Sequence, residues 1–127
     1  MASARSRRAA EVLRDRTRAH RAAAATRRAV ARAARRIHTG ARSLVTHILA
    51  TGATRETVTG AANALRAVAK KAGIKGRSAR IRRTFTGFPN RTVTVFRYTR
   101  EQVARIAEQY KPRKAEYKVV RAALIAA

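Results

Sequence analysis

Positive charge dominates this chain and limits the size of the hydrophobic core that it can build. The 127 residues include 31 Lys and Arg against 6 Asp and Glu, for a formal net charge of +25. Ala supplies 30 residues, whereas Val, Ile, Leu and Phe together number only 24. A highly charged chain with so few bulky apolar side chains lies close to the composition of disordered proteins. Any fold must therefore be small and must leave most cations on its surface.

The composition also excludes several classes of protein. We expect no transmembrane helix, because the chain has no run of about 18 apolar residues. Cys is absent, which excludes a disulfide framework and a thiolate zinc site. No phosphate loop or catalytic motif is present, and so few bulky residues cannot wall a large pocket. We therefore predict that the protein is not an enzyme and has no cofactor, metal or small-molecule substrate.

The few titratable groups that could serve a site are expected to have ordinary roles. His20, His38 and His47 do not fall at metal-ligand spacing with a carboxylate, so we expect surface positions or phosphate contacts. The six acids are scattered among cations, and we expect most of them to form ion pairs within helices. The aromatic residues are expected to lie in the core, apart from Phe88 at a turn.

The distribution of charge and bulk along the chain divides it into two parts. Residues 1–38 hold 12 Arg and only four of the bulky apolar residues. The remaining residues hold the other 20 and can form a modest core. Thr39-Gly40 is a natural helix stop. We predict a helical arm over residues 1–38 and a small domain over residues 39–127.

The arm has a pattern that favours contact with a polyanion. Residues 8–37 contain neither Gly nor Pro and are mostly Ala and Arg, which are strong helix formers. Arg residues recur in steps of three and four along about 31 Å of one helix face. A phosphate backbone along that face would relieve their mutual repulsion. The predicted contacts on the arm are Arg14, Arg18, Arg21, Arg28, Arg32 and Arg35.

Two helices joined by a turn are predicted next. The first covers residues 41–50, and the second runs from a Thr54 cap to Ala72, where Gly73 ends it. One face of the second helix is apolar, and the opposite face has neither an acid nor a bulky apolar residue. Arg, Asn and Thr suit phosphates and base edges. The predicted contacts on this face are Arg55, Thr59, Asn63, Arg66 and Lys70.

A basic β-hairpin is predicted after the helix pair. Residues 78–86 and 91–99 are rich in β-branched and aromatic residues, and residues 87–90 read as a turn. Its predicted contacts are Arg80, Arg82, Arg83 and Arg91. Helix, turn, helix and basic hairpin resemble, in the order of elements, a winged helix-turn-helix domain. The resemblance covers residues 42–98 and implies that the second helix reads DNA while the hairpin acts as a wing.

Two helices are predicted to close the domain. Thr99 and Gln102 form a capping box for a helix to about Tyr110, and a last helix covers residues 113–126. The apolar stripe of the last helix should pack on the core, with homodimerisation as a second use. The fold class is thus mainly α with one β-hairpin: a long basic helix, a winged-helix-like domain and two C-terminal helices.

These patterns predict a small basic protein that binds double-stranded DNA through phosphates, with weak sequence preference. The abundance of Arg and Ala suggests a phage or a high-GC bacterium, and we expect a cytoplasmic, nucleoid-associated protein. One alternative is an RNA-binding protein, ribosome-associated or similar to an antitermination factor. Another is a regulator that docks on an acidic protein surface, such as that of RNA polymerase. Membrane binding is not expected, because the arm lacks a large apolar face.

Overall fold

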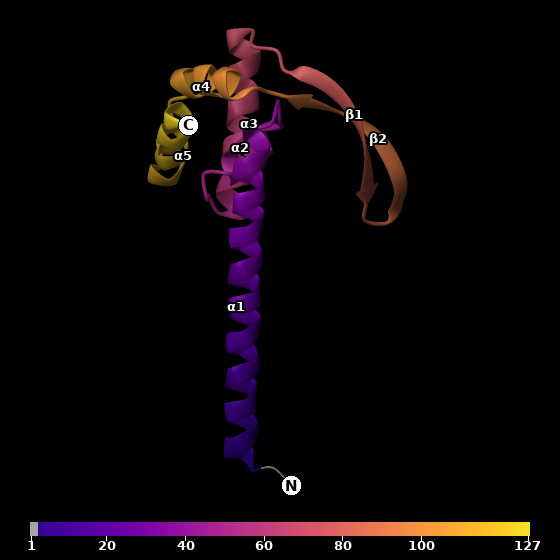
Figure 1. Cartoon of the computed structure of the whole chain (residues 1–127), viewed down its shortest axis with the longest axis vertical. Coiled ribbons are helices and arrows are strands. Elements are labelled where there is room, and N and C mark those ends of the chain that lie inside the picture. The colour runs from indigo at the N-terminus through magenta and orange to yellow at the C-terminus, as the bar shows by residue number, and fades with distance from the viewer. Residues whose placement is uncertain (1–2) are drawn as a thin grey trace.

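The protein is mainly helical, with one two-stranded antiparallel hairpin, as the sequence predicts. The computed structural model describes residues 3–127, apart from the side chains of Phe85 and Phe88. Figure 1 shows one long helix below a group of shorter helices, with a curved hairpin on one side. The elements in chain order are α1 (Ala4–Ile37), α2 (Leu44–Leu49), α3 (Arg55–Ala72), β1 (Arg77–Phe85), β2 (Phe88–Arg97), α4 (Arg100–Gln109) and α5 (Ala115–Ala126).

The hydrophobic core lies among α2, α3, α4 and α5, which we call the helical head. Its largest fully buried side chains are Leu44, Ile48, Leu65, Val103 and Ile106. Ala residues fill much of the remaining space on α3 and α4, so the helices can approach closely with few bulky side chains. This packing accounts for a folded domain despite the shortage of bulky residues.

Local signals determine where the head helices begin and end. The Thr54 side chain accepts a hydrogen bond from the Thr57 backbone N–H, and Gly73 ends α3 in the left-handed conformation at φ 72°. Thr99 and Gln102 form the predicted capping box of α4. The sequence-based boundaries of α3 and α4 are confirmed to within one residue, whereas α2 and α5 are shorter than predicted.

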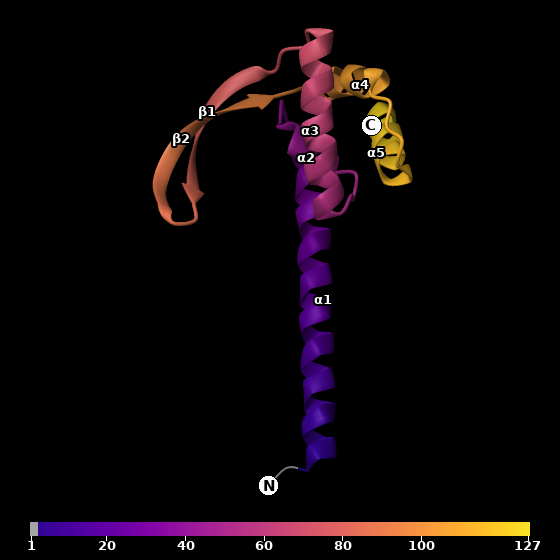
Figure 2. The ribbon, with the colours of Figure 1, turned by 180° about the vertical axis from the view of Figure 1, so that it is seen from behind.

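The long helix α1 stands largely outside the core. Only Ala33 and Ile37, in its last turns, are buried, and they pack where α1 meets α2. The rest of α1 extends from the head as a single stalk, seen from both sides in Figures 1 and 2. The helix ends at Ile37, next to the predicted division between residues 1–38 and 39–127.

The hairpin begins and ends elsewhere than the sequence predicts. Thr86 and Gly87 alone connect the strands, with Gly87 at φ 77°, so the predicted turn over residues 87–90 is wrong. Gly87 adopts its positive φ without steric cost, which lets the chain reverse within two residues. Pro89 lies within β2, which is tolerated because both strands of a two-stranded sheet are edges.

The base of the hairpin is joined to the head by a small set of polar contacts. The backbones of Arg42 and Tyr98 donate to one another, with N–O distances of 2.9 and 2.7 Å. The Nε2 atom of His47 lies 2.8 Å from the Tyr98 carbonyl oxygen. His47 is only 2% exposed, so the expectation that it is a surface residue is wrong. The reason is that α2 directs this ring toward the carbonyl groups of the bridge.

The last helix is only partly covered. Val120 and Leu124 of α5 are buried in the core, as predicted, whereas Val119 is 70% exposed. The preceding break places Tyr110 in the core, where burial, with a smaller effect of Tyr117, raises the pKa of its hydroxyl. No helix in residues 3–127 is both long and apolar enough to cross a membrane.

Candidate nucleic-acid interface

The arginines predicted on the arm are all exposed on α1. They are Arg14, Arg18, Arg21, Arg28, Arg32 and Arg35. Residues spaced by three or four lie on one side of a helix, and the buried side of α1 is defined by Ala33 and Ile37. The stripe lies well around the helix from that buried side. Packing of α1 on the head therefore leaves the stripe open to a ligand.

The predicted face of α3 is likewise exposed along its length, and two of its side chains have local partners. Arg55, Asn63 and Lys70 are exposed. The Thr59 hydroxyl donates to the Arg55 carbonyl oxygen at 3.1 Å, so its proton is already used within the helix. Arg66 donates from Nη1 to the Asn63 side-chain oxygen at 3.0 Å. Asn63 therefore holds the Arg66 guanidinium in place.

The register of the hairpin separates its arginines onto two faces. Arg80 pairs with Thr94 and Arg82 with Thr92, so these four side chains share one face. Arg83 pairs with Arg91, and these two belong to the other face. All four arginines are exposed. The hairpin thus presents cations in both directions.

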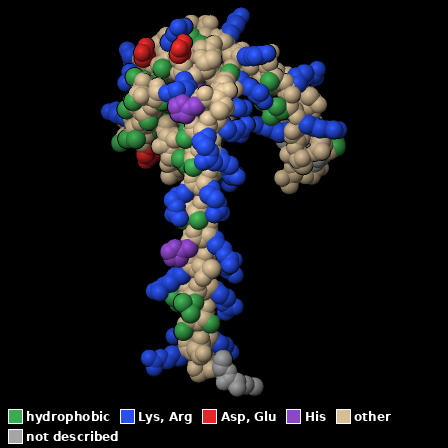
Figure 3. All heavy atoms as spheres, viewed as in Figure 1, with side chains coloured by type: hydrophobic (Ala, Val, Ile, Leu, Met, Phe, Trp, Pro, Cys, Tyr) green, Lys and Arg blue, Asp and Glu red, His purple; other side chains and the backbone are tan. Residues whose placement is uncertain are grey.

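The structure brings two predicted contacts from distant segments together. Arg66 of α3 and Arg83 of β1 line one groove between the head and the hairpin, with a volume of about 460 Å³. Figure 3 shows the open space between α1 and the curved hairpin, with Lys and Arg side chains around it. Cations of α3 and the hairpin therefore line one groove, and cations of α1 and the hairpin border the open space next to it (Figure 3).

Carboxylates do little to neutralise these cations. Within the described residues, the one ion pair joins Asp15 and Arg18 at 3.9 Å, and both side chains are exposed. The expectation that most acids form helix ion pairs is therefore wrong. Glu11 and Glu101 lie three or four residues from Arg14 and Arg105, so the spacing permits pairs, but exposed ion pairs gain too little to hold two side chains in one geometry. In Figure 3 the visible acidic side chains lie mainly on the head, away from the hairpin.

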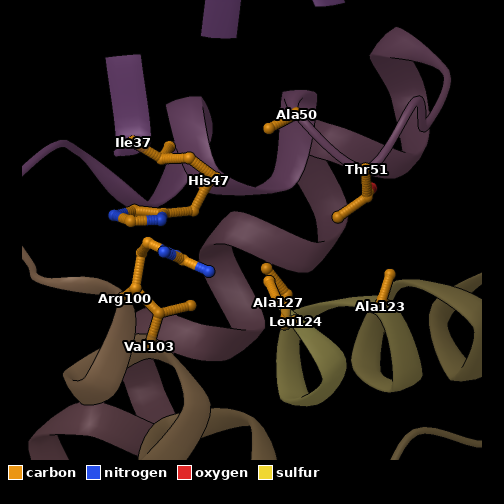
Figure 4. Close-up of a pocket in the computed structure, with 9 residues that line it drawn as sticks. All are labelled: Ile37, His47, Ala50, Thr51, Arg100, Val103, Ala123, Leu124 and Ala127. Carbon is orange, nitrogen blue, oxygen red and sulfur yellow. The ribbon is translucent and has the colours of Figure 1, made fainter. Parts of the chain in front are cut away.

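A second pocket lies where the end of α1 meets the head, and its lining differs from that of the groove. It measures about 160 Å³ and is bordered by His47, Arg100 and Leu124 among other residues (Figure 4). Arg100 donates from Nη1 to His38 Nδ1 at 2.9 Å. Burial lowers the pKa of His47, and the nearby Arg100 lowers it further, against the opposing effect of the Tyr98 and Arg42 carbonyls. A neutral His47 fits its role in holding the base of the hairpin.

The described residues contain no cluster of three or more His, Asp or Glu side chains that could hold a metal ion. His20 lies within α1 and His38 directly follows its last residue, and both are exposed. The chemistry available at this surface is therefore that of guanidinium, ammonium, amide and hydroxyl groups. These groups bind anions and hydrogen-bond acceptors.

One residue of this region was placed incorrectly by the sequence reading. Phe96 was expected in the core, but its side chain is 53% exposed and lines the groove with Arg66 and Arg83. The position of Phe96 in the strand could have indicated its exposure, because Phe96 lies on the same face of β2 as the polar residues Thr92 and Thr94. The predicted special position of Phe88 lies outside the side chains that the structure describes.

Comparisons with known proteins give no relative: no family model, no curated protein and no solved structure matches this chain.

Proposed function

We propose that this protein binds double-stranded DNA, mainly through phosphate contacts and with weak sequence preference. The observation behind the proposal is the exposure of all 15 predicted contact residues on α1, α3 and the hairpin, with Arg66 of α3 and Arg83 of the hairpin on one groove and α1 and the hairpin around one open space (Figure 3). Because only one ion pair is present among the described residues, this surface repels itself unless a polyanion is bound. Double-stranded DNA offers a regular array of phosphates at the required density.

The three elements would have different roles in the complex. The Arg stripe of α1 would follow a phosphate backbone for about 31 Å. In the winged-helix-like interpretation, α3 faces the major groove and the hairpin touches backbone or minor groove. Asn63 and Arg66, which are bonded to each other, are the side chains best suited to contact bases. Non-specific binding requires only the phosphate contacts.

A salt-titrated mobility shift tests the proposal. The probes are random duplex DNA, AT-rich duplex DNA and structured RNA of equal length. If about 8 phosphates are neutralised, the logarithm of the affinity for duplex should fall with the logarithm of salt at a slope near −7. A slope shallower than about −3 would refute binding by phosphate neutralisation. Tighter binding of RNA than of either duplex at 150–200 mM salt would instead favour the RNA-binding alternative.

The proposed cellular setting is the bacterial nucleoid, and the regulator that docks on an acidic protein surface is the rival to test. Pull-down after nuclease treatment separates the two, because a DNA-dependent partner is lost and a directly bound protein is retained. A protein partner that is retained after nuclease treatment would favour the regulator over DNA binding.

A further inference from the structure

The groove between the head and the hairpin has an apolar floor that nothing in the described residues covers. Phe96 is 53% exposed and Val45 is 38% exposed, and both line the groove. Half-exposed apolar side chains are common singly, but here two face the same space beside the buried Tyr98 ring. The arrangement provides a flat apolar surface that is accessible from solvent.

The rim of the groove adds positive charge from two sides. Arg66 of α3 and Arg83 of β1 both line the groove, and no carboxylate does. The strand register places Arg83 on the face opposite Phe96, so Arg66 is the cation that can serve a ligand stacked on Phe96. Arg66 is oriented by its 3.0 Å hydrogen bond to Asn63. Thr94 also lines the groove. A ligand that fits this chemistry has a flat apolar face and a negative charge close to it.

A nucleotide combines these two properties. The base has a π-face that stacks on aromatic side chains irrespective of its identity, and the attached phosphates suit guanidinium groups. The volume of about 460 Å³ lies within the range of pockets that hold small ligands. A base that is paired within a duplex keeps both of its faces stacked, so only an unpaired base can enter.

We propose that this groove binds one unpaired nucleotide, with its base stacked on Phe96 and its phosphates beside Arg66. The inference rests on the proposed function, because the nucleotide belongs to the nucleic acid that the basic surface binds. The protein would then prefer DNA that contains a bulge or a gap over a perfect duplex. The arm and the remaining arginines would contribute the same affinity to the interrupted DNA and to the perfect duplex.

The test compares three DNA probes in mobility shifts at 150 mM salt: a perfect duplex, the same duplex with a one-nucleotide bulge, and one with an abasic bulge. The abasic probe has the same backbone and flexibility but no base. Loss of an aromatic stacking partner costs about 5- to 150-fold in affinity. We expect the wild type to bind the bulged probe more tightly than both other probes by a factor in this range.

Three variants assign the preference to the groove. Phe96→Ala should abolish it and leave the affinity for perfect duplex and the salt slope unchanged, whereas Phe96→Tyr should retain it. Val119→Ala removes a more exposed apolar side chain on α5, outside the groove, and is the matched control. A bulge that contains 5-iodouracil should form a photo-crosslink to the peptide that contains Phe96. Thermal melts verify that each variant is folded.

The outcomes separate the two proposals. Equal binding of bulged and perfect duplex, an equal preference for the abasic bulge, or a preference that survives Phe96→Ala would overturn the nucleotide site and leave DNA binding intact. Absence of binding to every probe at low salt would remove both.

Discussion

Neutralising one face of α1 should change the salt dependence of DNA binding by a predictable amount. We propose a variant in which Gln replaces five exposed arginines of the stripe: Arg14, Arg21, Arg28, Arg32 and Arg35. Arg18 is retained because it pairs with Asp15. The stripe extends about 31 Å, and one strand of duplex DNA has roughly 9 phosphates over that length at one per 3.4 Å. Each of the five cations can therefore have its own phosphate.

The magnitude follows from counterion release. Each lost phosphate contact reduces the slope of log affinity against log salt by about 0.9. Loss of all five contacts should therefore make the slope shallower by about 4.5. Fluorescence anisotropy with a labelled 30-base-pair duplex, titrated with salt, measures this slope directly. Circular dichroism should show that α1 remains helical, because Gln is a good helix former.

A control of equal charge distinguishes placement from net charge. Five exposed cations on the α4 and α5 side of the head, Arg105, Lys111, Arg113, Lys114 and Lys118, are replaced by Gln in a second variant. We expect its slope to stay within about one unit of the wild-type value. Equal slope changes in the two variants would refute the assignment of the interface to α1 and leave only non-directional attraction.

Four further outcomes are expected. Ile48→Ala, at a side chain with 0% exposure, should lower the free energy of unfolding by about 2–5 kcal/mol, measured by urea denaturation. Gly76→Ala would place a Cβ 2.8 Å from the Arg97 carbonyl oxygen; it should lower the melting temperature, and an unchanged value would argue against this close packing. Because burial lowers the pKa of His47 from its ordinary value of 6.5, the unfolded chain takes up a proton that the folded protein resists. Stability should therefore fall as the pH drops below 6.5; thermal melts from pH 7.5 to 5.5 should show this in the wild type and much less in His47→Gln. Far-ultraviolet circular dichroism should show more helix in α1 when duplex DNA is added, and an unchanged spectrum would mean that repulsion among its arginines does not fray it.

The sequence predicts most of the helical fold because the relevant signals are local. Thr54, Gly73 and the Thr99 capping box act within one helical turn, and the apolar faces of α3 and α4 follow the helical period. The hairpin turn was misjudged because Pro89 and Asn90 have turn propensity of their own. In the structure the strands continue to the backbone pair of Phe85 and Phe88, so Pro89 and Asn90 belong to β2. The local sequence pattern does not specify which residues pair across the turn.

The sequence predicts which cations of the candidate site are exposed. It does not predict how cations from different elements are placed relative to one another. The outward position of Arg66 follows from the apolar face of its own helix. Its approach to Arg83 depends on how the hairpin leaves the head, which the backbone bridge between Arg42 and Tyr98 determines. His47 was missed for the same reason, because its carbonyl partner lies 51 residues away in the chain. Tertiary contacts of this kind have no short-range signature.

The separation of core from charge explains how so basic a chain can fold and still present its cations to a ligand. The head satisfies its packing with Ala-rich helices and few bulky residues, so most of the cations stay on the surface. Much of the repulsion among them then falls on two projections, α1 and the hairpin, that have few contacts with the core to lose. Salt should therefore act in opposite directions on the two properties of the protein: screening relieves repulsion and favours the folded arm, whereas the same screening weakens attachment to DNA. A surface whose charges served mainly to stabilise the fold through ion pairs would instead lose stability as salt rises.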